Sequence, residues 1–97
     1  MKSDEAQLLQ ALCETTDPAE MRRVLADLLT RSEYAAVLKR WKILRLLREG
    51  LSQLETARRI GGSLCNVTRG ASLLRDKTCA SAVLMNRLEK TTHPAKK

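Results

Sequence analysis

The chain is poor in aromatic residues: its 97 residues include one Tyr, Tyr34, one Trp, Trp41, and no Phe. A hydrophobic core must therefore be built from Leu, Val, Ile, Ala and Met side chains. A chain of this length buries only a modest fraction of its surface and is marginally stable by itself. We therefore expect it to complete its core by pairing with a second copy of itself.

Histidine and cysteine are also scarce, and their spacing argues against a metal site or a disulfide framework. The three cysteines, Cys13, Cys65 and Cys79, lie far apart without a Cys-x-x-Cys motif, and the single histidine is His93. Neither a cluster with the spacing of a catalytic site nor a glycine-rich phosphate loop is present. The sequence therefore predicts a protein that is not an enzyme and carries no cofactor.

The sequence has no long hydrophobic run. No stretch approaches the roughly 18 apolar residues of a membrane-spanning helix. The acidic start Ser3-Asp4-Glu5 differs from the basic start of a signal peptide. Cysteines without a pairing pattern are typical of a reducing compartment. We therefore expect a cytoplasmic protein with no membrane partner.

Positive charge is present in excess and is unevenly distributed. The formal net charge is +7, and residues 39–75 hold nine Lys and Arg residues against two Glu residues. The whole excess therefore falls in this segment. A basic surface is often no more than a solvated one, but such clustering favours a polyanionic partner such as nucleic acid.

The hydrophobic pattern is helical throughout, with no alternating strand-like run. Asp17-Pro18 and the capping boxes Thr30–Glu33 and Ser52–Glu55 mark helix starts, and Gly50 ends the third helix. The apolar residues of the third helix that we expect to face inward are Tyr34, Val37, Leu38, Trp41, Leu44 and Leu47. The predicted helices cover residues 3–14, a segment from 18, then 31–49, 53–60, 63–75 and 78–90, with a frayed tail over 91–97. The fold class is all-α, in a single domain of residues 1–97.

Two glycines, Gly61 and Gly62, interrupt the helical pattern in "LSQLETARRIGGSLCNVTRG", residues 51–70. Small Ala57, four residues before Gly61, suits two helices that cross closely, and Gly61 suits a corner with positive φ. The second glycine suggests a looser turn. Any helical hairpin needs a glycine, but the surrounding positive charge favours a DNA-binding helix-turn-helix at about 53–76.

The second helix of this motif carries polar residues near its N-terminal half, where a recognition helix meets base edges. Asn66 matches the bidentate pattern of adenine, and Thr68 suits a phosphate or a thymine methyl. Cations on either side suit phosphates, which fix the register on duplex DNA. The predicted DNA-binding residues are Lys39, Gln53, Ser63, Asn66, Thr68, Arg69 and Arg75.

Residues 27–74, "DLLTRSEYAAVLKRWKILRLLREGLSQLETARRIGGSLCNVTRGASLL", resemble the Trp repressor family. The similar elements are Leu29-Thr30 with Glu33, Arg40 ten residues after Thr30, Gly50-Leu51-Ser52-Gln53 and Val67-Thr68-Arg69-Gly70. The resemblance covers about half of the chain. It is more specific than a general helix-turn-helix, because Thr-Arg-Gly inside the second helix is unusual for that motif.

The resemblance implies a tryptophan-dependent transcriptional repressor of operator DNA, an intertwined homodimer of six-helix chains with L-tryptophan as corepressor. It implies that the indole lies between the guanidinium groups of Arg40 and Arg69, and that Arg69 also pairs with the carboxylate. Few direct base contacts are implied, so the backbone N–H groups of Leu64 and Cys65 become DNA-binding candidates as phosphate or water donors.

The same resemblance places the remainder of the corepressor site on the chain segment before the third helix. It implies that the Thr30 hydroxyl of the partner subunit bonds the carboxylate and that two carbonyl oxygens hold the ammonium, while a glycine leaves room for the ring. We expect Gly70→Leu to fill that room without disturbing the fold. The implied corepressor residues are Asp27, Leu29, Thr30, Arg40, Arg69 and Gly70.

Two residues depart from the family pattern, and two further functions stay open. Leu73 stands where the family commonly has a serine that touches the ligand's amino group, and Leu54 stands where well-known members have a base-contacting arginine.

The candidate site residues also allow other functions. Arg40 and Arg69 also suit phosphates alone, and Thr30 suits a simple N-cap. The alternatives are a ligand-independent helix-turn-helix regulator and a basic helical adaptor that binds protein.

Overall fold

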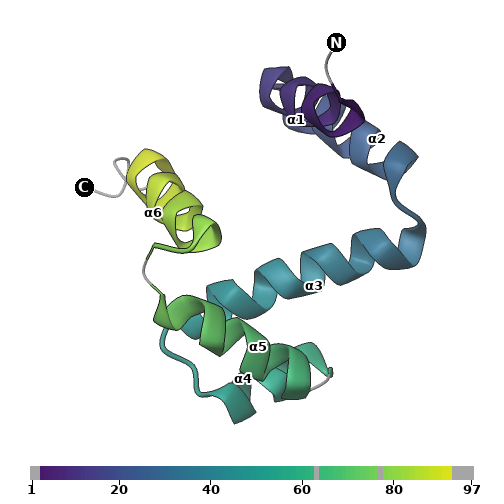
Figure 1. Cartoon of the computed structure of the whole chain (residues 1–97). Coiled ribbons are helices and arrows are strands. Elements are labelled where there is room, and N and C mark those ends of the chain that lie inside the picture. Colours follow the sequence, from purple (N-terminus) through teal and green to yellow (C-terminus); the bar gives the residue numbers. More distant parts are fainter. Residues whose placement is uncertain (1–2, 63, 77, 93–97) are drawn as a thin grey trace. The chain divides into compact units, whose positions relative to one another are not determined.

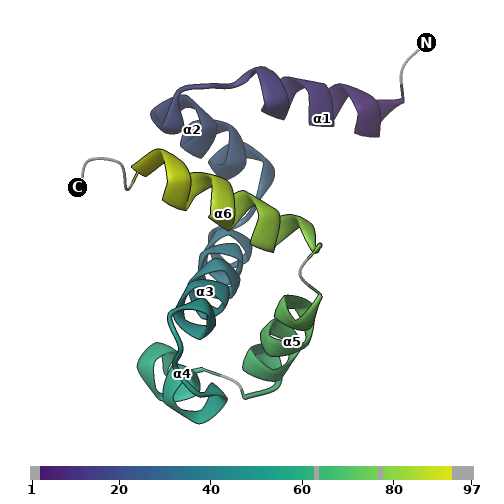
Figure 2. The same ribbon diagram turned by 90° about the vertical axis from the view of Figure 1, so that its left-hand side faces the viewer.

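The computed structural model describes residues 3–62, 64–76 and 78–92, and these ranges contain six α-helices and no strand (Figures 1 and 2). The helices are α1 (Asp4–Glu14), α2 (Pro18–Leu28), α3 (Arg31–Arg48), α4 (Gln53–Ile60), α5 (Leu64–Arg75) and α6 (Ala80–Thr92). The predicted all-α class is confirmed. The tail predicted over 91–97 overlaps α6 at residues 91 and 92, and its remainder lies outside the described residues.

Side-chain caps explain where several helices begin. Before α3, Thr30 Oγ1 accepts a hydrogen bond from the Glu33 N–H at 3.1 Å, and Thr30 N–H donates to Glu33 Oε1 at 2.7 Å. Before α4, Ser52 Oγ accepts from the Glu55 N–H at 3.0 Å. Both predicted boxes therefore form at the start of their helices, the first with reciprocal bonds. Asp17 precedes α2 but its carboxylate makes no capping bond, so the proline at N1 marks this start.

The chain divides into two compact units, Met1–Val37 and Leu38–Lys97, with the boundary inside α3. In the first unit, neither α1 nor α2 contains a buried residue. The core lies in the second unit and consists of Ile43, Leu44, Leu46, Val67, Ala82 and Met85. The inward face predicted for α3 is wrong at Val37 and Leu38, which are 45 % and 54 % exposed, because no described part of the same chain covers them.

In the second unit, α4 and α5 pack side by side as a helix-turn-helix (Figures 1 and 2). Gly61 caps the C-terminal end of α4; it has a φ of +61° and donates its N–H to the Ala57 carbonyl at 3.0 Å. The predicted need for positive φ at this corner is confirmed. A Cβ added at Gly62 would lie at an ordinary 3.6 Å from Ile60 and Lys39 side-chain atoms. The turn therefore needs the first glycine for its backbone and not the second.

Gly70 allows α5 to approach α3 closely. This glycine is buried, and a Cβ built on it would lie 2.9 Å from Ile43 Cγ2 and 3.4 Å from Leu44 Cδ2. Ile43 is itself fully buried and β-branched, so its methyl group has little room to move. Gly70 is therefore required for helix packing. This corrects the expectation that a leucine at this position would leave the fold intact.

A hydrogen-bonded turn joins α5 to α6. One carboxylate oxygen of Asp76 accepts from the Thr78 N–H at 2.9 Å and from the Thr78 hydroxyl at 2.6 Å. The Cys79 Sγ then accepts from the Ala82 N–H at 3.4 Å. Because the Thr78 side chain is engaged by the preceding aspartate, α6 begins at Ala80, two residues later than predicted.

The two bonds from Thr78 hold the pKa of Asp76 below its usual range, with the hydroxyl as the larger cause. This carboxylate therefore stabilises the folded chain above the ordinary Asp pKa, and its contribution is lost as pH falls through the lowered value. We expect Thr78→Val to raise the Asp76 pKa toward its usual range, as followed by NMR titration. Thr78→Ser should keep the lowered value, and an equal pKa in all three proteins would contradict the turn described here.

Candidate functional site

A cavity of about 190 Å³ brings α3, α5 and α6 together within the second unit. Its lining residues are Arg40, Ile43, Leu44, Asn66, Arg69, Gly70, Leu73 and Ser81. Three of the implied corepressor residues, Arg40, Arg69 and Gly70, are therefore on one cavity although they come from two helices. Gly70 serves this site indirectly as well, because its close contact with Ile43 sets the spacing between α3 and α5.

The electrostatics of this cavity suit an anion with a flat apolar part. Among the described residues, neither Arg40 nor Arg69 takes part in an ion pair, and no carboxylate lines the cavity. The guanidinium groups stand beside apolar walls formed by Ile43, Leu44 and Leu73. Arginine binds carboxylates through its planar fork and stacks on aromatic rings. This combination of arginines and apolar wall therefore suits the carboxylate and the ring of an aromatic amino acid.

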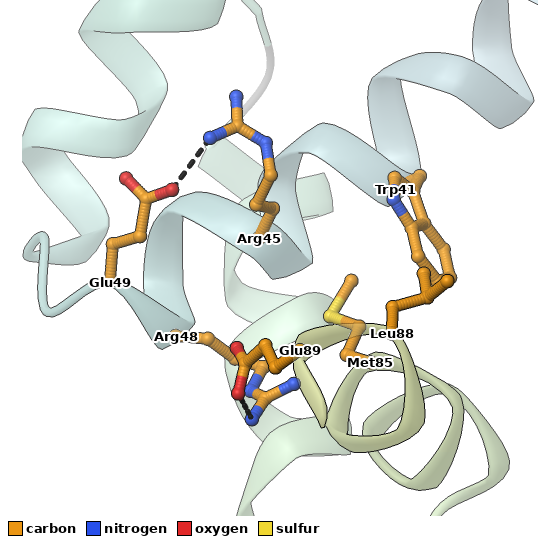
Figure 3. Close-up of a pocket in the computed structure, with 7 residues that line it drawn as sticks. All are labelled: Trp41, Arg45, Arg48, Glu49, Met85, Leu88 and Glu89. Carbon is orange, nitrogen blue, oxygen red and sulfur yellow. Dashed lines mark hydrogen bonds and ion pairs between the residues drawn. The ribbon is translucent and has the colours of Figure 1, made fainter. Parts of the chain in front are cut away.

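A second cavity of the same unit, of about 210 Å³, has a different charge balance (Figure 3). Trp41, Met85 and Leu88 form its apolar side. Its cations are paired, since Arg45 contacts Glu49 at 2.6 Å and Arg48 contacts Glu89 at 3.4 Å. No residue predicted for ligand or DNA binding lines this cavity. Because each arginine of this cavity is paired with a glutamate, the cavity is less suited to binding an anion than the cavity of Arg40 and Arg69.

The remaining implied corepressor residues lie in the first unit, around the junction of α2 and α3. Thr30 is exposed, and its oxygen already accepts the capping bond from Glu33. Asp27 is exposed near the end of α2, and Leu29 follows that helix. None of the turn and cap hydrogen bonds of the described residues uses the carbonyl oxygens of Asp27 or Leu29. These two oxygens are therefore available as acceptors, as expected of carbonyls at a helix C-terminus.

The residues predicted to bind DNA are distributed over α4, α5 and the adjoining part of α3. Gln53, the first residue of α4, accepts a hydrogen bond at Oε1 from the Thr68 hydroxyl of α5 at 3.2 Å. This bond joins the two helices and leaves the Gln53 amide N–H groups as donors. The Lys39 side chain lies beside the turn, since its Cδ would be 3.6 Å from a Cβ on Gly62. Both side chains therefore lie at the helix-turn-helix, and their contact with a duplex stays a prediction.

The two ends of α5 carry the other DNA-binding candidates. Leu64 and Cys65, the first residues of the helix, are exposed, as is Arg75, its last residue. The backbone N–H groups of Leu64 and Cys65 are at the first turn of the helix, where phosphates commonly bind, and their assignment to DNA stays a prediction. Asn66 is half-buried and lines the cavity of Arg69, so it lies less outward than predicted. Ser63 lies outside the described residues.

Comparison with known proteins identifies the family. The family profile described as "Trp repressor protein" matches residues 4–89. The chain belongs to the Trp repressor family. Its relatives include the Trp operon repressor homologs of Xylella fastidiosa strains M23 and Temecula1 / ATCC 700964, each 39 % identical over 70 residues, which cover 71 % of this chain and 76 % of the relative. No solved structure gives a significant match.

The Trp repressor family comprises transcription regulators and not enzymes, so the prediction that the chain is not an enzyme is confirmed. Within the described residues, no group of three or more His, Cys, Asp and Glu is arranged to hold a metal ion. No helix in the same ranges has the length and apolar character needed to cross a membrane.

Several residues that line the cavity of Arg40 and Arg69 were not predicted from the sequence of this Trp repressor family member. Ile43 and Leu44 form part of its apolar wall: Leu44 was predicted to face inward but was not assigned to the site, and Ile43 is its buried neighbour in α3. Ser81 was missed completely. No local signal marks it, because its place depends on the path of α6 across the second unit.

Proposed function

We propose that this protein is a tryptophan-dependent transcriptional repressor that acts in the cytoplasm as a single DNA-binding domain. It binds operator DNA through α4 and α5, with L-tryptophan as corepressor. The observation that carries the proposal is the pair of uncompensated guanidinium groups, Arg40 and Arg69, on one cavity beside the helix-turn-helix. Membership of the Trp repressor family supports the same reading.

In the proposed complex the indole ring lies between Arg40 and Arg69, with the apolar wall of the cavity beneath it. Each guanidinium attracts the ring face, which is worth about 0.5–2 kcal/mol per cation depending on exposure. Arg69 also pairs with the ligand carboxylate. The Thr30 hydroxyl of the partner subunit donates to that carboxylate, and the carbonyl oxygens of Asp27 and Leu29 accept from the ammonium.

Ligand binding at this site acts on DNA binding through α5. Arg69 and Gly70 lie on the same helix as Thr68, one and two residues from this predicted phosphate contact. A ligand held between Arg40 of α3 and Arg69 of α5 fixes the angle of α5. In the dimer this sets the two recognition helices about one turn of DNA apart, roughly 34 Å. By linkage, operator DNA must tighten tryptophan binding by the same factor.

The proposed assembly is an intertwined homodimer. The first unit has amphipathic helices but no buried residue in α1 or α2, and Leu8, Leu9 and Leu28 are exposed there. Large exposed apolar surfaces of this kind mark interaction sites. A second copy that covers these helices gives them the core that one chain lacks, and it places Thr30 of the partner subunit in reach of the corepressor.

Thr30→Asp separates the capping role of this residue from its proposed ligand contact. Aspartate is as good an N-cap as threonine, so we expect the free energy of unfolding to change by less than about 0.5 kcal/mol. The variant loses the hydroxyl donor and brings a negative charge to the ligand carboxylate. We expect tryptophan affinity to fall at least about tenfold, a loss comparable to one charged hydrogen bond. If calorimetry shows unchanged affinity for tryptophan, Thr30 acts only as a helix N-cap and not as a ligand contact.

The test of the proposed function is calorimetric titration of L-tryptophan into the purified protein, with L-phenylalanine and L-histidine as comparison ligands. We expect saturable heat with L-tryptophan and none with L-histidine, whose imidazole is too polar for the apolar wall. Absence of heat, together with duplex binding that ignores L-tryptophan, would instead support a ligand-independent regulator. Duplex binding that ignores salt would support a protein-binding adaptor.

A further inference from the structure

The cavity of Arg40 and Arg69 contains few hydrogen-bond acceptors. The two arginines only donate, and Ile43, Leu44 and Leu73 offer no polar side-chain atom. The acceptors among the lining side chains are Oδ1 of Asn66 and Oγ of Ser81. Both residues are half-buried, and neither side chain is hydrogen-bonded to another described residue. A ligand with an ammonium group therefore finds two side-chain acceptors in this cavity.

Ser81 and Asn66 lie on different walls of the cavity, Ser81 on α6 and Asn66 on α5. α3 contributes one cation and apolar groups to the cavity, and α5 contributes the other cation, an amide and apolar groups. Ser81 is the single lining residue from α6. Asn66 lies one helical turn before Arg69 on the same helix, so its amide stands next to a guanidinium that repels an ammonium. The acceptor on the third wall is the better placed of the two.

The position of Ser81 is fixed by its surroundings. The next residue, Ala82, and Met85 are both part of the core of the second unit. Further along α6, Asn86 Oδ1 accepts a hydrogen bond from Arg48 of α3 at 2.6 Å, and Glu89 pairs with the same guanidinium. α6 is therefore joined to α3 beyond the core contact, on its C-terminal side. Packing of the neighbouring core residues therefore holds Ser81 on the cavity wall.

We propose that Ser81 is a specificity-determining residue of the corepressor site, whose hydroxyl accepts a hydrogen bond from the ligand's ammonium group. This inference rests on the proposed function and adds a contact to it. The hydroxyl makes the cavity select an α-amino acid over an indole carboxylate that lacks the amino group. Through this contact the ligand connects α6 to α3 and α5.

The test compares two ligands in two variants by calorimetry. The ligands are L-tryptophan and indole-3-propionate, which keeps the ring and carboxylate but lacks the ammonium. In Ser81→Ala we expect L-tryptophan to bind about tenfold more weakly, the size of one hydrogen bond to a charged group, while indole-3-propionate binds as it does to the wild type. Ser72→Ala, an exposed serine of α5 outside the cavity, is the matched control and should change neither affinity.

Each outcome decides between this inference and the proposed function. Binding of L-tryptophan to Ser81→Ala with unchanged affinity would overturn the role of Ser81 and leave the proposed function standing. Equal weakening of both ligands would also overturn it, because the hydroxyl would then act on the ring or the carboxylate. Failure of L-tryptophan to bind the wild-type protein would overturn the proposed function itself.

Discussion

Arg69→Ala is expected to lower the affinity for L-tryptophan at least about a hundredfold, because it removes both a charged fork on the carboxylate and a cation above the ring. Among the described residues Arg69 forms no ion pair, so its removal leaves no orphaned carboxylate and should not unfold the chain. Calorimetry measures the affinity, and a thermal melt monitors the fold. With the ligand lost, tight operator binding should no longer respond to tryptophan.

The matched control for this variant is Arg59→Ala. Arg59 is an exposed arginine of α4 that does not line the cavity. We expect its replacement to lower the net charge equally and to leave tryptophan affinity within about twofold, since long-range charge effects are weakly felt at physiological salt. An Arg69→Ala protein that still needed tryptophan for tight DNA binding would show that the corepressor lies elsewhere.

Gly70→Leu is expected to lower the free energy of unfolding by about 3 kcal/mol, the upper part of the usual range for overpacked cores. The first added carbon would already lie 2.9 Å from Ile43 Cγ2, and the rest of the side chain has to displace α5 from α3. Loss of tryptophan binding should follow from the altered spacing of Arg40 and Arg69. Urea denaturation followed by circular dichroism measures the stability change.

Gly62→Ala is the control that separates packing from the general cost of replacing glycine. A Cβ there meets other atoms at no less than 3.6 Å, and the backbone does not need a positive φ. We expect this variant to be as stable as the wild type or slightly more stable, because it restricts the unfolded chain. A Gly70→Leu protein with wild-type stability would contradict the close approach of α3 and α5.

Helix positions were predictable from the sequence because the signals that set them are local. The boxes at Thr30–Glu33 and Ser52–Glu55 form with short bonds, and Gly61 has the positive φ that its place after Ile60 demands. The start of α6 was less predictable. Thr78 looks like the beginning of a helix, but its hydroxyl is bound by Asp76, a competition that only the folded turn settles.

Burial was harder to predict than helix position. An amphipathic stripe shows that a face is apolar but not which element covers it, and in α3 the buried residues include Ile43 and Leu46 rather than Val37 or Leu38. Gly70 illustrates the same limit. The family resemblance assigns it to the ligand, but its main contact in the structure is with the core of α3. Contacts between helices depend on distances that sequence spacing does not contain.

The candidate site was only partly predictable for a related reason. Family resemblance pointed to Arg40 and Arg69, and the structure brings both onto one cavity. It pointed to no residue of α6, because Ser81 reaches the cavity through tertiary packing of Ala82 and Met85. Asn66 was assigned to DNA from its helical register alone, and that assignment stays a prediction.

The central claim is that a tryptophan held by Arg40 and Arg69 controls DNA binding, and one measurement tests it most directly. A duplex selected from random-sequence DNA with the protein and L-tryptophan is titrated with protein in the absence of tryptophan and at saturation. We expect saturating L-tryptophan to tighten binding about 5- to 150-fold, the range of typical coupling free energies. Equal affinity for the selected duplex with and without L-tryptophan would contradict the account.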